Sequence, residues 1–331
     1  MEEKQYKVSV LMLTFNQEKY VNEAIKGVMN QETEFTFQLV IGDDCSTDQT
    51  LQICKKWQGR YPSRIVILEN ERNKGLQQNF IRTYNACNCV YMAICEGDDY
   101  WIDKHKLQRQ VKFLDLHPDF STCIHRVVNY YEEDRSMSLS NGGQKRVTNI
   151  IDLAQSNYIS NVSAVFRKGL FGPLPEWFSE VSTYDYAVHL LNAQFGKIYY
   201  MPRCMAVYRK HNSAIWSRSG VDKQYIIAIK IRELLMDYFK GTQPLVYDQL
   251  LNAYNNNSIA LLRYYLNQKD QAKVELVREM LLHHNPNWTR EELLEKERIP
   301  VETDPLKRRV MGILKEGRIV ISRMIPVPHV K

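Results

Sequence analysis

The sequence lacks the features of a secreted, membrane-spanning or zinc-binding chain. Its 331 residues include 7 cysteines, an odd number with no Cys-x-x-Cys pair, which predicts reduced and buried thiols. No apolar run approaches the roughly 18 residues that cross a bilayer, and the acidic start "MEEKQ" is unlike a secretory signal. We therefore expect a folded, cytoplasmic protein.

The sequence also lacks the strong positive charge typical of nucleic-acid-binding proteins and the glycine-rich turn typical of dinucleotide- and phosphate-binding proteins. The net charge of +6, from 44 Lys and Arg against 38 Asp and Glu, is too small and too dispersed to predict nucleic-acid binding. The first strand-to-helix turn, "TFNQEKY", contains no glycine, so the dinucleotide fingerprint and the phosphate-binding glycine loop are both absent. A bound phosphate would need another kind of partner.

Strand-like and helix-like segments alternate along the first two thirds of the chain, which predicts an α/β fold with a mostly parallel sheet covered on both faces. Ser46 and Gln49 have the spacing of a capping box that opens a helix. The polar stretch 132–146, which contains Gly142 and Gly143, predicts a mobile loop. The expected strands are 8–14, 37–42, 64–69, 90–95, 121–131, 197–201 and 204–211.

From residue 221 onwards the apolar pattern has helical periodicity only, so we place a boundary near Gly220. Residues 1–220 form the expected catalytic domain, and 221–331 a helical C-terminal region. The tail 306–326 interleaves basic and apolar residues. It suits either an anionic membrane surface or a helix docked on its own protein.

Polar residues follow four of the expected strands, and the carboxyl ends of parallel strands share one edge of a sheet. Such residues also cap helices and turns for purely structural reasons, and Asp43 and Asp44 are open to that interpretation. The adjacent carboxylates of Asp98 and Asp99 would repel a diphosphate unless a divalent cation lay between them, and oxygen ligands favour Mg²⁺ or Mn²⁺. The strand-end groups are 14–16, 43–44, 73–75 and 96–99.

Four ordered motifs, "VSVLMLTFNQEKYVNEAI", "VIGDDCSTDQT", "ERNKGLQQN" and "CEGDDYW", resemble those of the family 2 glycosyltransferases over roughly residues 7–211. The resemblance implies a GT-A fold and inverting transfer of a sugar from a nucleotide diphosphate, most often a UDP-sugar, to an acceptor hydroxyl with the help of Mn²⁺ or Mg²⁺. It also implies bacterial polysaccharide biosynthesis.

The same resemblance assigns roles to individual residues. It places Asp98 on the donor sugar, Asp99 and His211 on the metal, and Asp43 or Asp44 on the base. "LQQN" departs from the usual run, which leaves the role of Asn79 open. The other residues implied in donor binding are Thr14, Phe15, Asn16, Glu18, Lys74 and Gly75.

Inverting transfer also needs a carboxylate that takes the proton of the acceptor hydroxyl. Asp185 in "STYDYAVHLL" matches the position of this base, although Tyr184 stands where the family usually has a second acid. A carboxylate that only stabilises a helix N-terminus is the alternative. His211 could equally be a surface imidazole, and Arg209 could face a diphosphate or water.

Two other functions fit part of the pattern. A sugar-phosphate nucleotidyltransferase also uses aspartate-held Mg²⁺, and a non-catalytic protein could bind a nucleotide or carbohydrate at the same edge. The segment 132–183 carries no readable acceptor code. With the basic tail, it suggests a glycan or lipid-linked acceptor and peripheral contact with the inner face of the plasma membrane.

Overall fold

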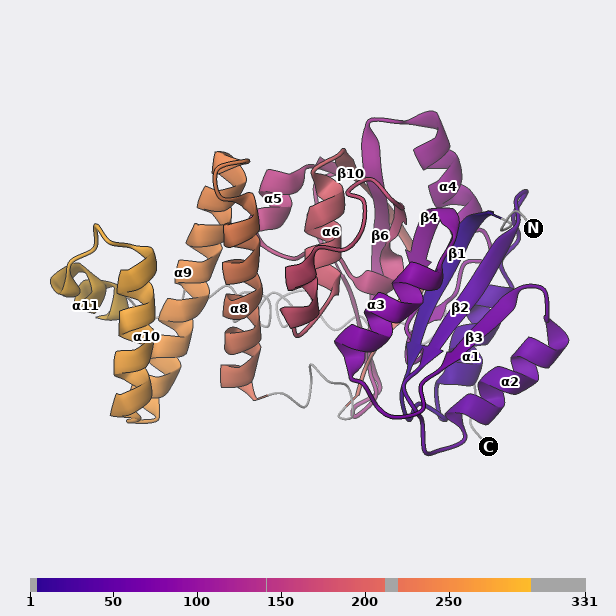
Figure 1. Cartoon of the computed structure of the whole chain (residues 1–331), viewed down its shortest axis with the longest axis horizontal. Coiled ribbons are helices and arrows are strands. Elements are labelled where there is room, and N and C mark those ends of the chain that lie inside the picture. Colours follow the sequence, from indigo (N-terminus) through magenta and orange to yellow (C-terminus); the bar gives the residue numbers. More distant parts are fainter. Residues whose placement is uncertain (1–4, 141, 212–219, 299–331) are drawn as a thin grey trace.

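The computed structural model describes residues 5–140, 142–211 and 220–298. A mixed, mostly parallel sheet forms its centre, with the order β3-β2-β1-β4-β9-β6-β10-β5, while β7 pairs with β6 and β8 with β10 (Figure 1). The strands are β1 Tyr6–Thr14, β2 Phe37–Asp43, β3 Ile65–Glu69, β4 Cys89–Ile94, β5 Tyr100–Trp101, β6 Phe120–Tyr131, β7 Ser136–Leu139, β8 Val147–Thr148, β9 Val165–Arg167 and β10 Lys197–Lys210.

The helices lie between these strands and after them. Those of the first 220 residues are α1 Val21–Met29, α2 Thr50–Arg60, α3 Leu76–Ala86, α4 Lys106–Leu116, α5 Ile150–Gln155 and α6 Asp185–Ala193, with short 3₁₀ turns η1 Asn161–Ser163 and η2 Glu176–Glu180. The later helices are α8 Val221–Phe239, α9 Pro244–Asn267, α10 Gln271–His284 and α11 Arg290–Arg298.

The parallel half of the sheet sets the edge at which polar residues gather. β1 pairs in parallel with β2 and with β4, and β2 pairs in parallel with β3, so these strands end on the same side. β9 runs antiparallel between β4 and β6 and joins the two halves. Strand β1 is buried from Val8 to Thr14 because both faces of the sheet are covered, which is why it is a continuous apolar run in the sequence.

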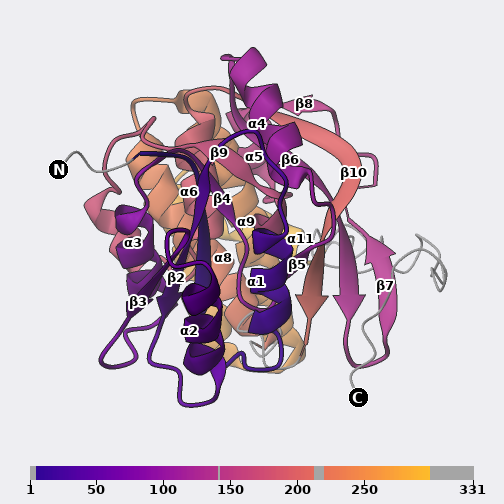
Figure 2. The same ribbon diagram turned by 90° about the vertical axis from the view of Figure 1, so that its right-hand side faces the viewer.

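Helices cover the sheet in two layers. α1, α2 and α4 pack on one face, around a core that includes Val10 and Met12 of β1. α3 and α6 pack on the other face, around Leu11 and Leu13 of the same strand (Figure 2). The alternation of these β1 residues between two cores is the period-2 pattern of a strand buried on both sides.

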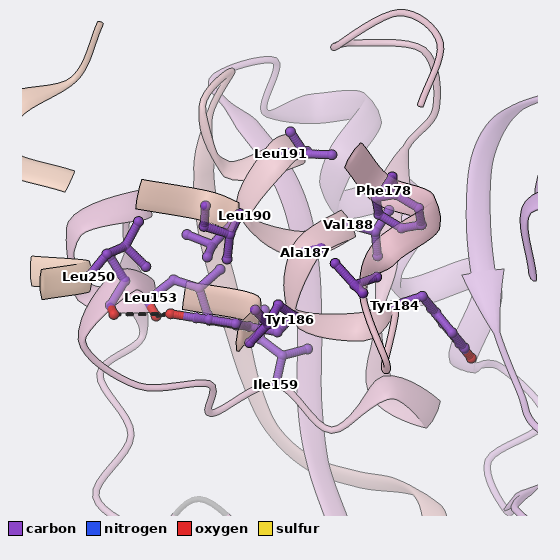
Figure 3. Packing of buried hydrophobic residues seen from close by; sticks show 14 of the residues in the cluster. Leu153, Ile159, Phe178, Tyr184, Tyr186, Ala187, Val188, Leu190, Leu191 and Leu250 are labelled. Atoms are coloured by element: carbon purple, nitrogen blue, oxygen red, sulfur yellow. Dashed lines mark hydrogen bonds between the residues drawn. The ribbon is translucent and has the colours of Figure 1, made fainter. Parts of the chain in front are cut away.

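The C-terminal helices share a hydrophobic core with the face that carries α6. Leu250 of α9 packs with residues of α5 and α6 (Figure 3), and the ring centroids of Trp177 and Tyr238 lie 5.5 Å apart. α8 begins one residue after Gly220. The division of the chain into two domains stays a prediction, and the basic tail lies outside the described residues. No helix in the described ranges is long and apolar enough to cross a membrane.

Three local predictions were wrong. Stretch 132–146 is not simply a loop, because β7 forms an antiparallel hairpin with β6. The two expected strands 197–201 and 204–211 are one strand, β10, whose register against β6 shifts on either side of Cys204. Ser46 does not cap α2, since its hydroxyl donates to the Oδ1 of Asp43 at 2.6 Å and the helix begins at Thr50.

Candidate active site

Three carboxylates converge in the turn that follows β4. Glu96, Asp98 and Asp99 each offer an oxygen, and these oxygens lie within 4.8 Å of one another. The turn needs glycine at 97, because a Cβ there would lie 2.3 Å from the Oε1 of Gln17 and 2.8 Å from the Cγ2 of Thr14. The sequence Glu-Gly-Asp-Asp therefore packs against the end of β1 and concentrates negative charge at the edge of the sheet.

The crowding of these groups disfavours their charged forms. Burial and the neighbouring Asp98 raise the pKa of Glu96 to about 7, a shift that the Tyr184 hydroxyl opposes. Burial and the same neighbour, together with Glu96, raise the pKa of Asp99 well above its usual range. A divalent cation relieves such repulsion, and the donor set of carboxylate oxygens suits a hard ion. The residues present therefore fit a metal site.

Asp99 is held by the neighbouring strand. Its Oδ1 accepts the backbone N–H of Arg209 at 2.9 Å, and its Oδ2 is buried without a hydrogen-bond partner among the described groups. The Arg209 side chain donates to the Asp98 carbonyl at 2.9 Å and pairs with Glu23 at 2.7 Å, and its charge partly offsets the raised pKa of Asp99. Arg209 thus fastens β10 to the acidic turn and to α1, and in this arrangement its guanidinium contacts protein rather than the open edge.

Asp98 faces His211 at the end of β10. The Nε2 of His211 lies 3.1 Å from the Oδ2 of Asp98. The His211 ring is buried, with its centroid 4.8 Å from that of Tyr20, whose hydroxyl donates to Glu132 at 2.7 Å. His211 is therefore not a surface imidazole, and an imidazole nitrogen joins the carboxylate oxygens at this edge.

Asp185 lies at the first position of α6, half-buried, and its Oδ2 accepts a hydrogen bond from the Nδ2 of Asn157 at 3.2 Å. Its charge contributes to the raised pKa of Glu96, so the two carboxylates are within electrostatic reach of each other. The preceding Tyr184 donates its hydroxyl hydrogen to the Oε1 of Glu96. The structure thus brings the start of α6 to the acidic turn after β4.

The two aspartates that follow β2 organise the neighbouring loops. Asp43 is fully buried, and its Oδ1 accepts the hydroxyl of Thr14 at 2.9 Å. Asp44 accepts the backbone N–H groups of Lys74 and Gly75, both at 2.8 Å. Asp43 thus joins the ends of β1 and β2, and Asp44 joins the end of β2 to Asn70 after β3 and to the loop that leads into α3.

The remaining residues implied in donor binding line the outer side of this edge. Phe15 is 45% exposed, and Asn16 adopts a left-handed backbone conformation with φ of 52°. The Glu18 carboxylate accepts the backbone N–H of Gln49 at 3.0 Å, so this residue supports the start of α2. Gly75 also has a positive φ, 85°, and Lys74 beside it is exposed.

Asn79 and two tryptophans have structural roles. The Nδ2 of Asn79 donates to the Gly42 carbonyl at 2.7 Å, which ties α3 to β2. Trp101 is buried and donates to the Val162 carbonyl at 3.2 Å, while Trp177 packs on Tyr238.

Sequence reasoning assigned no role to Glu96 and treated Tyr184 only as a departure from the family pattern. Glu96 stands in the same short turn as Asp98 and Asp99, directly after the expected strand, and this proximity along the chain could have revealed it. Nothing in the local sequence indicates the partner of Tyr184, which is 88 positions away along the chain.

Comparison with known proteins identifies the fold family. Residues 9–211 match the family described as Glycosyl transferase family 2. This chain belongs to the family 2 glycosyltransferases. A nucleotidyltransferase or a non-catalytic binding protein is therefore no longer favoured, since the membership indicates a glycosyltransferase enzyme.

Individual relatives of this glycosyltransferase cover different parts of it. An uncharacterised protein of Mycobacterium bovis is 35% identical over 219 residues, which are 66% of this chain and 62% of the relative. The poly(ribitol-phosphate) beta-N-acetylglucosaminyltransferase TarS of Staphylococcus aureus is 34% identical over 113 residues, 34% of this chain and 19% of TarS. This chain thus spans less than two thirds of the length of either relative.

Two solved structures share the fold. Residues 1–349 of S. aureus TarS in complex with UDP-GlcNAc superpose with a TM-score of 0.54 at 19% identity, over 82% of this chain and 90% of that one. The mannosyltransferase PcManGT of Pyrobaculum calidifontis, in complex with GDP-Man and Mn²⁺, gives a TM-score of 0.52 at 15% identity, over 88% and 86% of the two chains. The GT-A fold predicted from the sequence is confirmed.

Proposed function

We propose that this glycosyltransferase moves a sugar from a nucleotide diphosphate, with a UDP-sugar as the first choice, to an acceptor hydroxyl with inversion at the anomeric carbon. The observation that carries the proposal is the convergence of Glu96, Asp98, Asp99 and His211 at the strand edge, with Asp185 nearby. The UDP-GlcNAc in the TarS complex and the GDP-Man in the PcManGT complex support a nucleotide-sugar donor.

The acidic group would hold Mn²⁺ or Mg²⁺. The sequence assigned the sugar to Asp98 and the metal to Asp99 and His211, but Asp98 is the carboxylate that faces His211. We therefore propose one metal site to which Asp98 and His211 both contribute. Asp99, through its Oδ2, and Glu96 would supply the other ligands. A bound divalent ion supplies charge stabilisation for the leaving diphosphate.

Asp185 is the proposed general base. In the displacement, the acceptor oxygen bonds to the anomeric carbon, the bond from that carbon to the diphosphate oxygen breaks, and the hydroxyl proton passes to Asp185. The hydrogen bond from Asn157 holds one carboxylate oxygen and orients the other. Position at the N-terminus of α6 favours the ionised carboxylate that the step requires.

The donor nucleotide would occupy the edge formed by the ends of β1 and β2. Exposed Phe15 offers an aromatic face for a base. Asp43 and Asp44, assigned to the base by the resemblance, are buried and already accept hydrogen bonds from the loops, so either would reach the base only by sharing or exchanging one of these bonds. Exposed Lys74 supplies a cation beside the loop that Asp44 holds. The left-handed backbone of Asn16 gives the turn after β1 its shape, which a glycine loop would otherwise provide.

Transfer assays with Mn²⁺ and a panel of UDP- and GDP-sugars test the proposal. We expect turnover with one nucleotide class, loss of turnover on chelation of the metal, and a product whose anomeric configuration, read by NMR, is opposite to that of the donor. Retention of configuration would contradict Asp185 as a simple base. Failure of every nucleotide sugar to bind in calorimetry would contradict the donor class.

The acceptor and the location of the enzyme are proposals of the same kind. TarS is named for poly(ribitol-phosphate), and other relatives are named as glycosyltransferases, which supports a glycan or lipid-linked acceptor in bacterial polysaccharide biosynthesis. We propose a cytoplasmic enzyme whose basic tail contacts the membrane surface. Sedimentation with anionic vesicles, comparing the intact chain with one that ends at Arg298, should show loss of binding; equal binding would contradict a role of the tail.

A further inference from the structure

Tyr184 joins the acidic turn to the helix that carries Asp185. Its hydroxyl donates to the Oε1 of Glu96, and the same hydroxyl oxygen accepts the Nδ2–H of Asn161 at 2.8 Å. The side chain is only 2% exposed, so water does not compete for these bonds. Residues from the end of β4, from η1 and from the start of α6 thus meet at one hydroxyl group.

The direction of these bonds determines what the hydroxyl does. A phenol has a single hydrogen, and the amide N–H of Asn161 can only donate. The hydrogen of Tyr184 must therefore point at Glu96, as a hydrogen bond to a carboxylate that is shorter and stronger than a neutral one. One oxygen of Glu96 is fixed in this way, and its carboxylate plane is set relative to Asp98 and Asp99.

The ring of Tyr184 is fixed as firmly as its hydroxyl. Its centroid lies 3.9 Å from that of Phe80, with an interplanar angle of 11°. Phe80 belongs to α3, the helix that follows the Lys74 and Gly75 loop. Because the stack fixes the ring plane, the hydroxyl cannot follow a movement of Glu96.

Tyr186, two residues further along the same helix, provides an internal comparison. Its single hydroxyl hydrogen is shared between the carbonyls of Leu153 and Ala154, 3.1 and 3.0 Å away, inside the hydrophobic core. Figure 3 shows the two rings extending to opposite sides of α6. Both are buried tyrosines with satisfied hydroxyls, but only Tyr184 reaches the acidic turn.

We propose that Tyr184 is a positioning residue that orients Glu96 within the metal-holding group, an inference that rests on the proposed function. Tyrosine takes the place of the acid that the family usually has before the base. Here it replaces a further negative charge with a hydrogen-bond donor. Partners of metal ligands commonly change metal affinity 10- to 100-fold when they are removed.

The variant Tyr184→Phe tests this inference, because it keeps the stack on Phe80 and removes only the hydroxyl. Titration calorimetry with Mn²⁺ alone should show binding weakened about 10-fold relative to wild type. In transfer assays the Mn²⁺ concentration for half-maximal rate should rise, with a smaller change in kcat at saturating metal. Tyr186→Phe is the matched control, and we expect it to lower the Tm while leaving Mn²⁺ binding unchanged.

A double-mutant cycle with Glu96→Gln tests whether Tyr184 affects Mn²⁺ binding by orienting Glu96 or only through its packing in the core. If Tyr184 acts through Glu96, removing its hydroxyl in the Glu96→Gln background should have little further effect on Mn²⁺ binding. Unchanged Mn²⁺ binding in Tyr184→Phe, or an equal loss in Tyr186→Phe, would overturn the inference and leave the proposed function intact. If wild type binds neither Mn²⁺ nor any nucleotide sugar, the proposed function fails, and the inference fails with it.

Discussion

The Nε2 of His211 lies 3.1 Å from the Oδ2 of Asp98, and this contact joins the end of β10 to the turn after β4. Both side chains are largely withdrawn from solvent, with 5% and 18% of their side-chain surface exposed. A histidine and a carboxylate this close either form a hydrogen bond or share a cation. Their position beside two further carboxylates favours the second role in the working enzyme.

Replacement of either Asp98 or His211 should therefore weaken metal binding while the protein stays folded. We expect Asp98→Asn and His211→Ala each to weaken Mn²⁺ binding at least 10-fold and to reduce transfer in proportion. The control is His105→Ala, which breaks an exposed histidine–carboxylate contact of 3.6 Å with Glu32. Calorimetry with Mn²⁺ measures all three variants. Unaltered binding in His211→Ala would remove this histidine from the site.

Asp185→Asn distinguishes a base from a carboxylate that merely stabilises a helix. As a general base, Asp185 should contribute on the order of 10² to 10⁴ to kcat, while donor binding stays close to wild type. The control is Asp152→Asn at the start of α5, where the carboxylate closes a capping box with Asn149. That change should lower stability by about 1 kcal/mol without affecting kcat. Near-wild-type turnover in Asp185→Asn would favour the helix-stabilising role instead.

Much of the fold is predictable because strands buried on both faces are continuous apolar runs. Such a run, Val8 to Thr14, identified β1, and parallel strands then place their ends on one edge. Because β1, β2 and β4 are parallel neighbours, the residues that follow them lie together at that edge. Strand β10 is different, because Pro202 and the register shifts near Cys204 divide its sequence pattern in two.

The sequence does not predict the hydrogen-bond and ion-pair partners of long polar side chains. Arg209 pairs with Glu23, 186 positions earlier, and its backbone holds Asp99. No local pattern distinguishes this arginine from one that faces a diphosphate, because the choice depends on how β10 passes the acidic turn. The roles of Glu96 and Tyr184 depend in the same way on where α6 docks.

Lys106 should make stability depend on pH. Its ammonium group is fully buried, 4.2 Å from the Trp101 ring centroid and without a hydrogen-bond partner among the described residues. Burial lowers its pKa from 10.5 to about 7. Between these pH values the unfolded chain binds a proton that the native protein does not, so the contribution of Lys106 to stability rises with pH.

We expect Lys106→Met to raise both the Tm and the unfolding free energy at pH 7. The gain in unfolding free energy has an upper bound of roughly 4 kcal/mol. The advantage over wild type should be largest at or below pH 7 and should vanish towards pH 10.5. Thermal melts at several pH values measure it. Lys104→Met, at an exposed lysine that pairs with Glu32, should change stability by less than about 1 kcal/mol at every pH. A constant difference between Lys106→Met and wild type across this range would contradict the prediction.

Gly97 is predicted to be indispensable for the shape of the acidic turn, although its backbone is not strained. In Gly97→Ala the new methyl group would meet the Oε1 of Gln17 at 2.3 Å and the Cγ2 of Thr14 at 2.8 Å. Gln17 can rotate away, but Thr14 is buried and hydrogen-bonded to Asp43, so the turn itself must move. We expect a loss of about 1 to 3 kcal/mol in unfolding free energy, together with weaker Mn²⁺ and donor binding.

Gly59→Ala is the matched control for this change. A Cβ at 59, within α2, would meet no atom within 4 Å, so the substitution should stabilise the helix by about 0.5 to 1 kcal/mol and leave Mn²⁺ binding as in wild type. Denaturant unfolding and Mn²⁺ calorimetry on both variants separate the two effects. If Gly97→Ala lost stability but bound Mn²⁺ and donor normally, the carboxylates would not depend on the position of the turn, and the metal-holding group would have to be placed elsewhere on the edge.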